Sequence, residues 1–225
     1  MEACKRTADT KDLILKSAKK YFLEYGYQAA PLRKIVSEAG FTPGALYGYF
    51  NSKEELFYAI TDPVANNLME VLDRIRSEMD ALPKKERLYG MGKVYYPHIP
   101  KIVDILIADR DAVKLIVNGA KGTKYENFLD IIAGRNALTI SKTVKNIEEK
   151  TIRPIKEQTI EVLMEGYIAT LFRLIISDKD RETIIRCMEI IGKIYETGII
   201  ALMQKEWGNE NDSDETKQHS GLEVP

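Results

Sequence analysis

Apolar residues recur three and four positions apart along most of the chain, and strand-type alternation is nearly absent. This spacing predicts helices almost throughout. In the first predicted helix the apolar stripe consists of Ile14, Ala18, Phe22 and Tyr25. Gly26 can end that helix because glycine adopts a positive φ without steric cost.

Two short helices are predicted at residues 32–39 and 43–49, joined by a turn of three residues. Gly40 supplies the left-handed residue that ends the first of them. Thr42 is placed to cap the second helix, with Pro43 at its first position. Two short helices with a tight turn, behind a supporting helix, make up a helix-turn-helix motif.

A longer helix is predicted from Ser52, whose hydroxyl can accept from the Glu55 amide while the Glu55 carboxylate returns to the cap. One further helix is expected to be kinked by Pro97 and Pro100. The predicted helices after the motif span residues 52–79, 86–107, 111–120, 124–150, 154–177 and 180–205.

The predicted fold class is therefore all-α, with an N-terminal three-helix DNA-binding domain joined to a larger helical domain for ligand binding and dimerisation. The boundaries expected for these parts are 1–51 for the helix-turn-helix domain and 52–207 for the effector-binding and dimerisation domain. Residues 208–225 carry five acidic residues and one lysine and few apolar side chains, so an acidic flexible tail is expected there.

The charge distribution indicates where nucleic acid is expected to bind. The whole chain has 33 basic and 34 acidic residues, a net charge of -1, which by itself points to no partner. Residues 1–53, however, hold nine basic and five acidic residues, so this segment has a net charge of +4. The basic segment coincides with the helix-turn-helix motif, as expected for a DNA-binding domain.

Several classes of protein are disfavoured by composition. Two cysteines cannot build a disulfide framework, and the apolar runs are far shorter than the roughly 20 residues of a membrane span, so a cytoplasmic protein with no membrane partner is expected. His98 and His219 are the only histidines, and there is no phosphate-binding glycine loop. We expect no catalytic residues, no metal and no cofactor.

One extended pattern goes beyond a generic helix-turn-helix. It consists of Gly26-Tyr27, Ile35, Ala39-Gly40-Phe41-Thr42, Gly44, Leu46-Tyr47, Tyr49-Phe50 and Ser52-Lys53-Glu54-Glu55-Leu56. In residues and spacing this segment resembles the TetR family of bacterial transcriptional regulators. The resemblance covers roughly residues 13–57, and it implies a homodimer that binds double-stranded DNA at a palindromic operator.

The resemblance also implies roles for individual residues. Contacts to phosphate are implied for Thr42, Tyr47, Tyr49 and Lys53. Proximity to base edges is implied for Pro43, Gly44 and Ala45, with Arg33 the best candidate for reading a guanine. Aromatic core packing is the alternative for the tyrosines, and a solvated surface position is the alternative for Lys53. Ala30 and Pro31 stand where the family usually has a hydroxyl, so one phosphate contact is in question.

The last two predicted helices carry apolar residues on more than one face, which indicates burial on two sides. One side can pack on the helical core of the larger domain and the other on the same two helices of a second subunit. The alternative is a purely intramolecular core. The dimer-interface residues predicted on this basis are Leu163, Tyr167, Leu171, Met188, Ile191, Tyr195 and Ile199.

The middle of the chain is predicted to hold a small-molecule effector of unknown identity in a mostly apolar pocket with a few polar groups. The candidate lining residues are Tyr95, Tyr96, His98, Asn118, Tyr125, Phe128 and Tyr167. Ordinary core packing is the alternative for the aromatic residues. His98 lies between two prolines, where an exposed or backbone-bonded imidazole is the alternative.

A ligand-responsive repressor is the function these features favour. The alternatives are an activator, a regulator controlled by a protein partner, and a helical adaptor whose helix-turn-helix no longer binds DNA. The absence of a hydroxyl at Ala30 and Pro31 is the reason to retain the adaptor as an alternative. An enzyme is the least favoured class.

Overall fold

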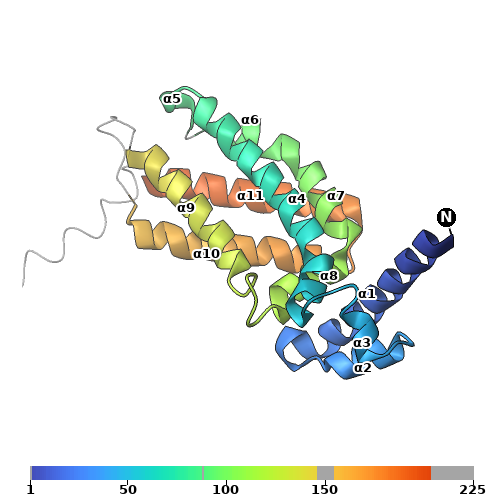
Figure 1. The fold of residues 1–225 in the computed structure, drawn as a ribbon. Helices are drawn as coiled ribbons and strands as arrows, with labels where there is room; N and C mark the ends of the chain where they lie inside the picture. Colours follow the sequence, from blue (N-terminus) through green and yellow to red (C-terminus); the bar gives the residue numbers. More distant parts are fainter. Residues whose placement is uncertain (1, 88, 146–154, 204–225) are drawn as a thin grey trace, which may run out of the picture.

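The computed structural model describes residues 2–87, 89–145 and 155–203, and within those ranges every regular element is a helix (Figure 1). The predicted tail at 208–225 lies outside the described residues. The elements in chain order are α1 (Glu2–Ala29), α2 (Leu32–Glu38), α3 (Pro43–Leu46), α4 (Lys53–Ala81), α5 (Lys84–Arg87), α6 (Met91–Val94), η1 (Tyr96–His98), α7 (Ile99–Ala108), α8 (Arg110–Lys114), η2 (Leu115–Gly119), α9 (Phe128–Lys145), α10 (Glu157–Ile175) and α11 (Arg181–Met203).

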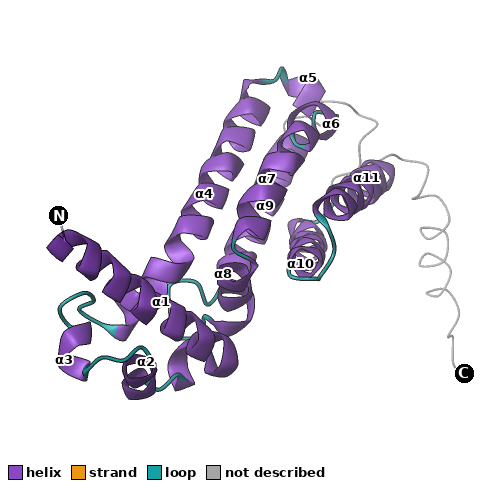
Figure 2. Ribbon diagram, turned by 90° about the vertical axis from the view of Figure 1, so that its right-hand side faces the viewer, coloured by secondary structure: helices purple, strands orange, loops and turns teal. Residues whose placement is uncertain are grey.

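The all-α class predicted from the sequence is confirmed. Helices α1 to α3 form a small head at one end of the molecule, and the remaining helices form an elongated body (Figures 1 and 2). No helix in the described ranges has the length and apolarity that a membrane crossing requires.

The apolar stripe of α1 is correctly predicted except at its end. Ile14, Ala18 and Phe22 are fully buried, but Tyr25 is exposed. Gly26 has the expected positive φ of 71° and a non-helical backbone, so the first helical segment ends there and α1 continues after a kink. The bend brings Tyr27 inward instead, with its ring centroid 5.2 Å from that of Phe57 on α4.

The turn between α2 and α3 is also confirmed. Gly40 has φ 82°, and the Phe41 amide donates to the Val36 carbonyl at 3.0 Å. Thr42 has the extended backbone of an N-cap and Pro43 is the first helical residue, but the Thr42 hydroxyl accepts no capping bond. That hydroxyl is therefore free to meet a group from outside the head.

Helix α4 begins at the predicted cap and leads from the head into the body. The Ser52 hydroxyl accepts from the Glu55 amide at 3.0 Å. The Glu55 carboxylate was predicted to accept from the amide of the cap residue. It accepts instead from the backbone and side-chain amides of Asn51, at 2.7 and 2.8 Å. These three bonds fix the first turn of α4 to the residues that precede it.

The single kinked helix predicted at 86–107 is wrong. Residues 84–108 form the short helices α5 and α6, the turn η1 and then α7. Pro97 lies within η1, because proline donates no backbone hydrogen bond and disfavours a helical residue before it. Pro100 is tolerated in the first turn of α7, where the missing N–H has no helical partner.

The head meets the body where α1 crosses η2 and α8. Gly26 and Gly119 approach so closely that a Cβ on Gly119 would lie 3.7 Å from the Gly26 Cα. Beside this contact, the Lys19 ammonium pairs with the Asp109 carboxylate at 2.7 Å. Since Asp109 also caps α8 by accepting from the Ala112 amide at 3.0 Å, the pair fixes α1 to the start of that helix.

Candidate functional site

Helix α3 presents one face to the core of the head and the other to solvent. Leu46 is buried, whereas Thr42, Pro43, Gly44 and Tyr47 are exposed. The two remaining members of the predicted surface, Ala45 and Tyr49, are half-buried. Most of the residues predicted to contact DNA therefore lie together on the outside of the head.

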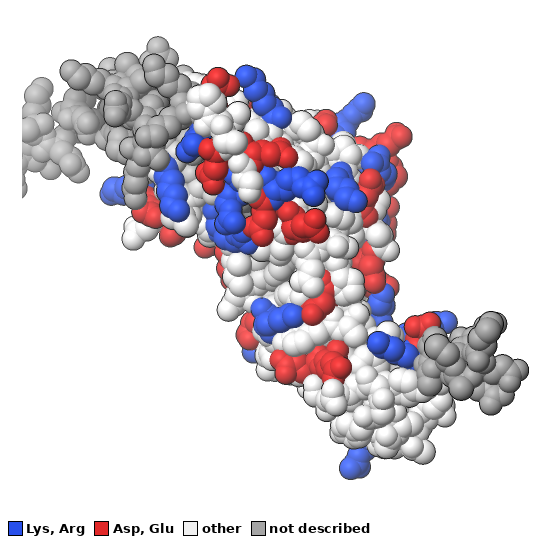
Figure 3. Space-filling model, turned by 45° about the horizontal axis from the view of Figure 1, so that its top comes forward, with Lys and Arg blue, Asp and Glu red and all other residues white. Residues whose placement is uncertain are grey.

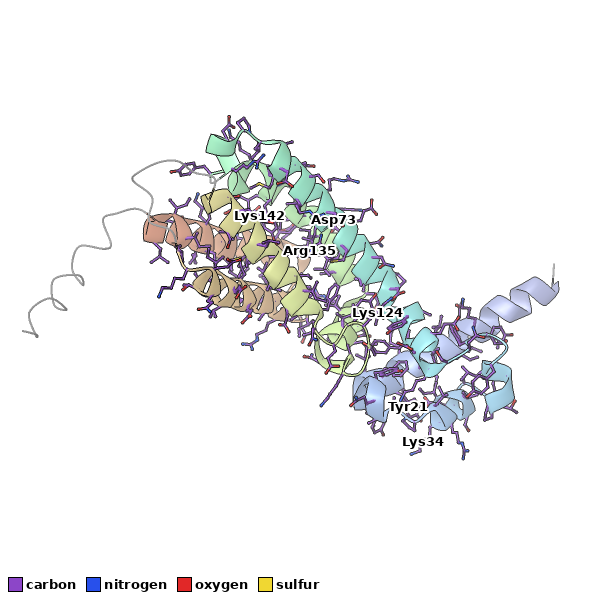
Figure 4. All side chains as sticks on the ribbon, turned by 60° about the vertical axis from the view of Figure 1, so that its left-hand side comes forward. Tyr21, Lys34, Asp73, Lys124, Arg135 and Lys142 are labelled. Atoms are coloured by element: carbon purple, nitrogen blue, oxygen red, sulfur yellow. The ribbon has the colours of Figure 1, made fainter. Side chains whose placement is uncertain are left out.

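Helix α2 is held against α1 by a buried hydrogen bond, in which the Ser17 hydroxyl donates to the Ile35 carbonyl at 2.8 Å. Arg33 and Lys34 project from the exposed side of this helix. Neither side chain has an ion pair or hydrogen bond with the described part of the chain. Figure 4 shows Lys34 at the outer end of the head, remote from the body.

Charge is distributed differently over the two parts of the molecule. On the face drawn in Figure 3, basic and acidic side chains alternate over the body, while the head is mostly uncharged with isolated basic residues. Part of the positive charge of the head is internally neutralised, because Lys20 pairs with Glu38 at 2.6 Å. The hydrogen bond from Lys20 lowers the pKa of the Glu38 carboxyl.

Lys53, predicted to contact phosphate, is already engaged within the protein. Its ammonium donates to the Gln28 carbonyl at 3.0 Å and lies 5.2 Å from the centroid of the Tyr27 ring. Partial burial lowers the pKa of this lysine. A phosphate contact by Lys53 therefore requires its ammonium to leave or share the carbonyl at the end of α1.

The departure at Ala30 and Pro31 affects solvent contact only at position 31, which is half-buried. The Ala30 side chain is buried, so a hydroxyl there would face the core. Pro31 is the N-cap of α2 and offers no side-chain capping bond. The hydroxyl missing for a phosphate contact is the one at position 31.

The body encloses a cavity of about 130 Å³ between α4, α9, α10 and α11. Of the seven residues predicted to line a pocket, Tyr95 and Tyr167 do so. Tyr96 lies behind this wall and donates to the cavity residue Glu196 at 3.0 Å. The other residues lining the cavity are Leu72, Ile75, Arg76, Met79, Arg87, Asn136, Thr139, Ile140, Thr143, Met164, Gly192, Tyr195, Ile199 and Ile200.

The other four predicted pocket residues lie elsewhere, so the expectation of one shared pocket needs correction. His98 Nε2 lies 2.9 Å from a carboxylate oxygen of Glu78 on α4, and Asn118 is exposed. Tyr125 and Phe128 pack edge to face, with ring centroids 5.4 Å apart, where the chain enters α9. The separation arises because the broken segment 84–98 and the turns before α9 direct these side chains away from the cavity.

The predicted dimer-interface residues also need correction. Leu171 and Met188 are buried within the single chain, and Tyr167, Tyr195 and Ile199 line the cavity. The two others, Leu163 and Ile191, are half-buried against the core. The most exposed large apolar side chains of α10 and α11 are Val162, Ile190 and Ile194, with exposed fractions of 66, 53 and 64%.

The feature of the cavity that the sequence analysis missed is a buried carboxylate. Only 7% of the Glu196 side-chain surface is exposed. Its position on α11 among isoleucines was a signal, because a charged residue on an apolar face is rarely buried without a partner or a role. The hydroxyl of Tyr167, also buried, has no hydrogen-bond partner in the described part of the chain.

Comparison with known proteins agrees with this geometry. Residues 14–60 match the family described as bacterial regulatory proteins, tetR family. The HTH-type transcriptional repressor AcnR of Corynebacterium glutamicum is 31% identical over 67 residues, which are 30% of this chain and 36% of AcnR. The uncharacterized HTH-type transcriptional regulator YerO of Bacillus subtilis is 30% identical over 80 residues, 36% of this chain and 28% of YerO. The matches thus span roughly a third of these relatives' lengths.

The fold of the body also has a counterpart among solved structures. A TetR-like transcriptional regulator from Rhodococcus sp. RHA1 superposes with a TM-score of 0.54 at 14% identity, over 85% of this chain and 96% of the other. At this identity the likeness concerns the fold alone. The head thus matches the tetR family of bacterial regulatory proteins in sequence, and most of the chain resembles a TetR-like regulator in fold.

Proposed function

We propose that this protein is a DNA-binding transcriptional regulator whose head inserts α3 into the major groove. The observation that carries the proposal is the exposed surface of α3 inside the one basic segment of the sequence. Thr42, Pro43, Gly44 and Tyr47 face outward there, and Leu46 anchors the helix from behind. Short helices presented in this way are the usual readers of base edges.

The residues around α3 are assigned different tasks. Arg33 and Lys34 are exposed and unpaired within the described residues, so Arg33 is free to read a guanine and Lys34 to hold a phosphate. The free hydroxyl of Thr42 and the exposed Tyr47 supply further phosphate contacts, with the half-buried Tyr49 beside them. Lys53 can contact a phosphate if its ammonium donates to the phosphate and to the Gln28 carbonyl at the same time.

A palindromic operator requires two heads, and we assign the dimer contact to the exposed apolar surface of α10 and α11. Val162, Ile190 and Ile194 leave large apolar areas in water, and single subunits rarely do this on adjacent helices without a partner. A twofold axis through this surface would pack both helices against their copies in a four-helix bundle.

The cavity gives the regulator a place for an effector, and α4 links it to the head. Leu72, Ile75 and Met79 of α4 line the cavity, while the same helix starts at the Ser52 cap against the head. A ligand that moves α4 therefore changes the position of the heads in the dimer. For a repressor of this design, linkage requires that the effector binds the DNA-free shape more tightly.

The test is selection of binding sequences from random duplexes, followed by affinity measurements at several salt concentrations. We expect a palindrome to be enriched and log affinity to fall linearly with log salt. The double variant Thr42→Ala/Tyr47→Ala should lose binding, while Lys142→Ala, an exposed lysine on α9, should keep it. If no sequence is enriched and the double variant behaves as the parent does, the helical adaptor replaces this proposal.

A further inference from the structure

We infer that the cavity binds a cationic amphiphile, with the positive group against Glu196 and the apolar part along α4 and the end of α11. The inference rests on the proposed function in that this molecule would be the effector of the regulator. It goes further by naming the chemical class of the ligand from the residues of the wall.

Glu196 is the first reason. Its carboxylate is nearly removed from water, yet its partners in the described residues are the Tyr96 hydroxyl at 3.0 Å and the exposed Lys193 ammonium at 3.4 Å. A carboxylate in such a place retains an unfavourable desolvation free energy that a neutral hydroxyl and a long, solvated contact offset only in part. A cation in the cavity would complete the compensation.

Aromatic rings around this carboxylate are the second reason. Tyr167 and Tyr195 have ring centroids 4.9 Å apart and are tilted by 51°, and Tyr95 lines the same end of the cavity. Tilted aromatic walls beside an acidic group attract alkylammonium ions through the negative faces of the rings. The buried, unpartnered Tyr167 hydroxyl adds a free oxygen at the same end.

Gly192 makes room for this arrangement. A Cβ at this position would lie 3.0 Å from Cε1 of Tyr96 and 3.5 Å from the hydroxyl oxygens of both Tyr96 and Tyr167. Any larger residue would push the Tyr96 ring and disturb its bond to Glu196. The glycine therefore keeps the tyrosine hydroxyls grouped on one side of α11.

The remainder of the wall selects an apolar body for the ligand. Apart from the polar Asn136, Thr139 and Thr143 of α9, it is formed by aliphatic and thioether side chains, and methionines adapt readily to ligands of irregular shape. These residues are Leu72, Ile75, Met79, Ile140, Met164, Ile199 and Ile200.

Two arginines line the cavity, but both guanidinium groups are already engaged in contacts within the protein. Arg87 donates from Nε to the Leu82 carbonyl at 2.9 Å and from its terminal nitrogen to the Asp80 carbonyl. Arg76 is half exposed and pairs with Asp73 at 3.2 Å. An anionic ligand would thus compete for solvated or occupied guanidinium groups while lying near a buried carboxylate, which disfavours it.

The test uses three probes that share an alkyl chain, namely octyltrimethylammonium, nonanoate and octanol, titrated into the full-length protein by calorimetry. We expect the cation to bind about tenfold more tightly than octanol, and nonanoate more weakly than octanol. Glu196→Gln should bring the cation to within about twofold of octanol. The matched control Glu182→Gln, an exposed carboxylate on the same helix, should change nothing.

If Glu196→Gln lowers the melting temperature so far that binding cannot be measured, Tyr195→Leu removes one ring while keeping the wall apolar. It should weaken the cation severalfold and leave octanol unchanged. Equal affinity for all three probes, or a preference for nonanoate, would overturn the inference whether or not the protein binds DNA. Cation binding without any operator binding would overturn the proposed function and leave the ligand class standing.

Discussion

The Tyr125 hydroxyl donates to one oxygen of the Asp62 carboxylate at 2.6 Å, across the junction between the start of α9 and the first turns of α4. Lys124 adds an ion pair to the same carboxylate at 2.9 Å, and Figure 4 places this lysine between the two helices. Because α4 connects the head to the body and α9 lines the cavity, the bond ties the wall of the cavity to the helix that leads into the head.

Removing this bond should weaken the folded state. Tyr125→Phe is expected to lower the free energy of unfolding by about 1.5 to 3 kcal/mol, since a buried hydroxyl bonded to a carboxylate is lost while the ring is kept. Urea denaturation measures the change. Tyr89→Phe, at an exposed tyrosine, is the matched control and should have no effect. Equal stability of the two variants would mean that the bond contributes nothing.

Stability should fall in alkaline solution because of the tyrosines. Burial, together with neighbouring carboxylate or phenol groups, raises the pKa of Tyr96, Tyr125 and Tyr167 above their ordinary value. A raised folded-state pKa means that the stabilisation is complete below the unfolded value of about 10 and is lost as pH rises above it. Each tyrosine steepens the fall by up to about 1.4 kcal/mol per pH unit.

The measurement is the free energy of unfolding between about pH 9 and 11, with tyrosinate absorbance followed in parallel. Tyr167→Phe should flatten the slope, because one buried phenol no longer ionises on unfolding. A slope identical to that of the parent protein would contradict the assignment for this residue.

Specificity should depend on Arg33 and general affinity on Lys34. Arg33→Ala is expected to relax the choice of base at one position of each half-site, a loss of about 1 to 3 kcal/mol of discrimination. Lys34→Ala should weaken all duplexes alike and reduce the salt slope by about one unit per half-site. Point-substituted operators and random DNA separate the two. If Arg33→Ala weakens every duplex equally, its contact is with phosphate.

Oligomeric state should respond to the exposed apolar face of α10 and α11. Ile194→Glu is expected to convert a dimer to a monomer at micromolar concentration, because a charge would be buried in the contact. Sedimentation velocity measures this, and Leu13→Glu on α1, where the leucine is similarly exposed, should leave the dimer intact. A wild-type monomer would rule out the assigned contact.

The conformational preferences of individual residues were sufficient to predict the turn between α2 and α3 in the head. Gly40 allows the positive φ that ends α2, and Pro43 has a fixed φ suited to the first turn of α3, so the end of α2 and the start of α3 follow from the residue types alone. The error at Tyr25 lies directly before the kink at Gly26: Tyr25 is exposed, and the tyrosine that packs inward is Tyr27, on the other side of the kink. Periodicity holds only as far as the helix is regular.

The cavity was beyond such rules because its wall comes from distant segments. The Glu196 carboxylate accepts a hydrogen bond from Tyr96, which lies one hundred positions earlier in the sequence. No sequence pattern near either residue predicts this hydrogen bond. The exposed and cavity faces of α11 are similarly apolar, so the sequence cannot say whether Tyr195 or Ile194 meets solvent. Only the packing of α4 and α10 against α11 separates them.

The contact of Gly26 with Gly119 bears on how such regulators can be recombined. The two main chains meet directly at this contact, and the Lys19–Asp109 ion pair and the packing of Tyr27 on Phe57 lie on either side of the same junction. A chimera that keeps these contacts could join the head of one regulator to the body of another. Operator choice and effector choice could then be inherited separately, as interchangeable modules on one scaffold.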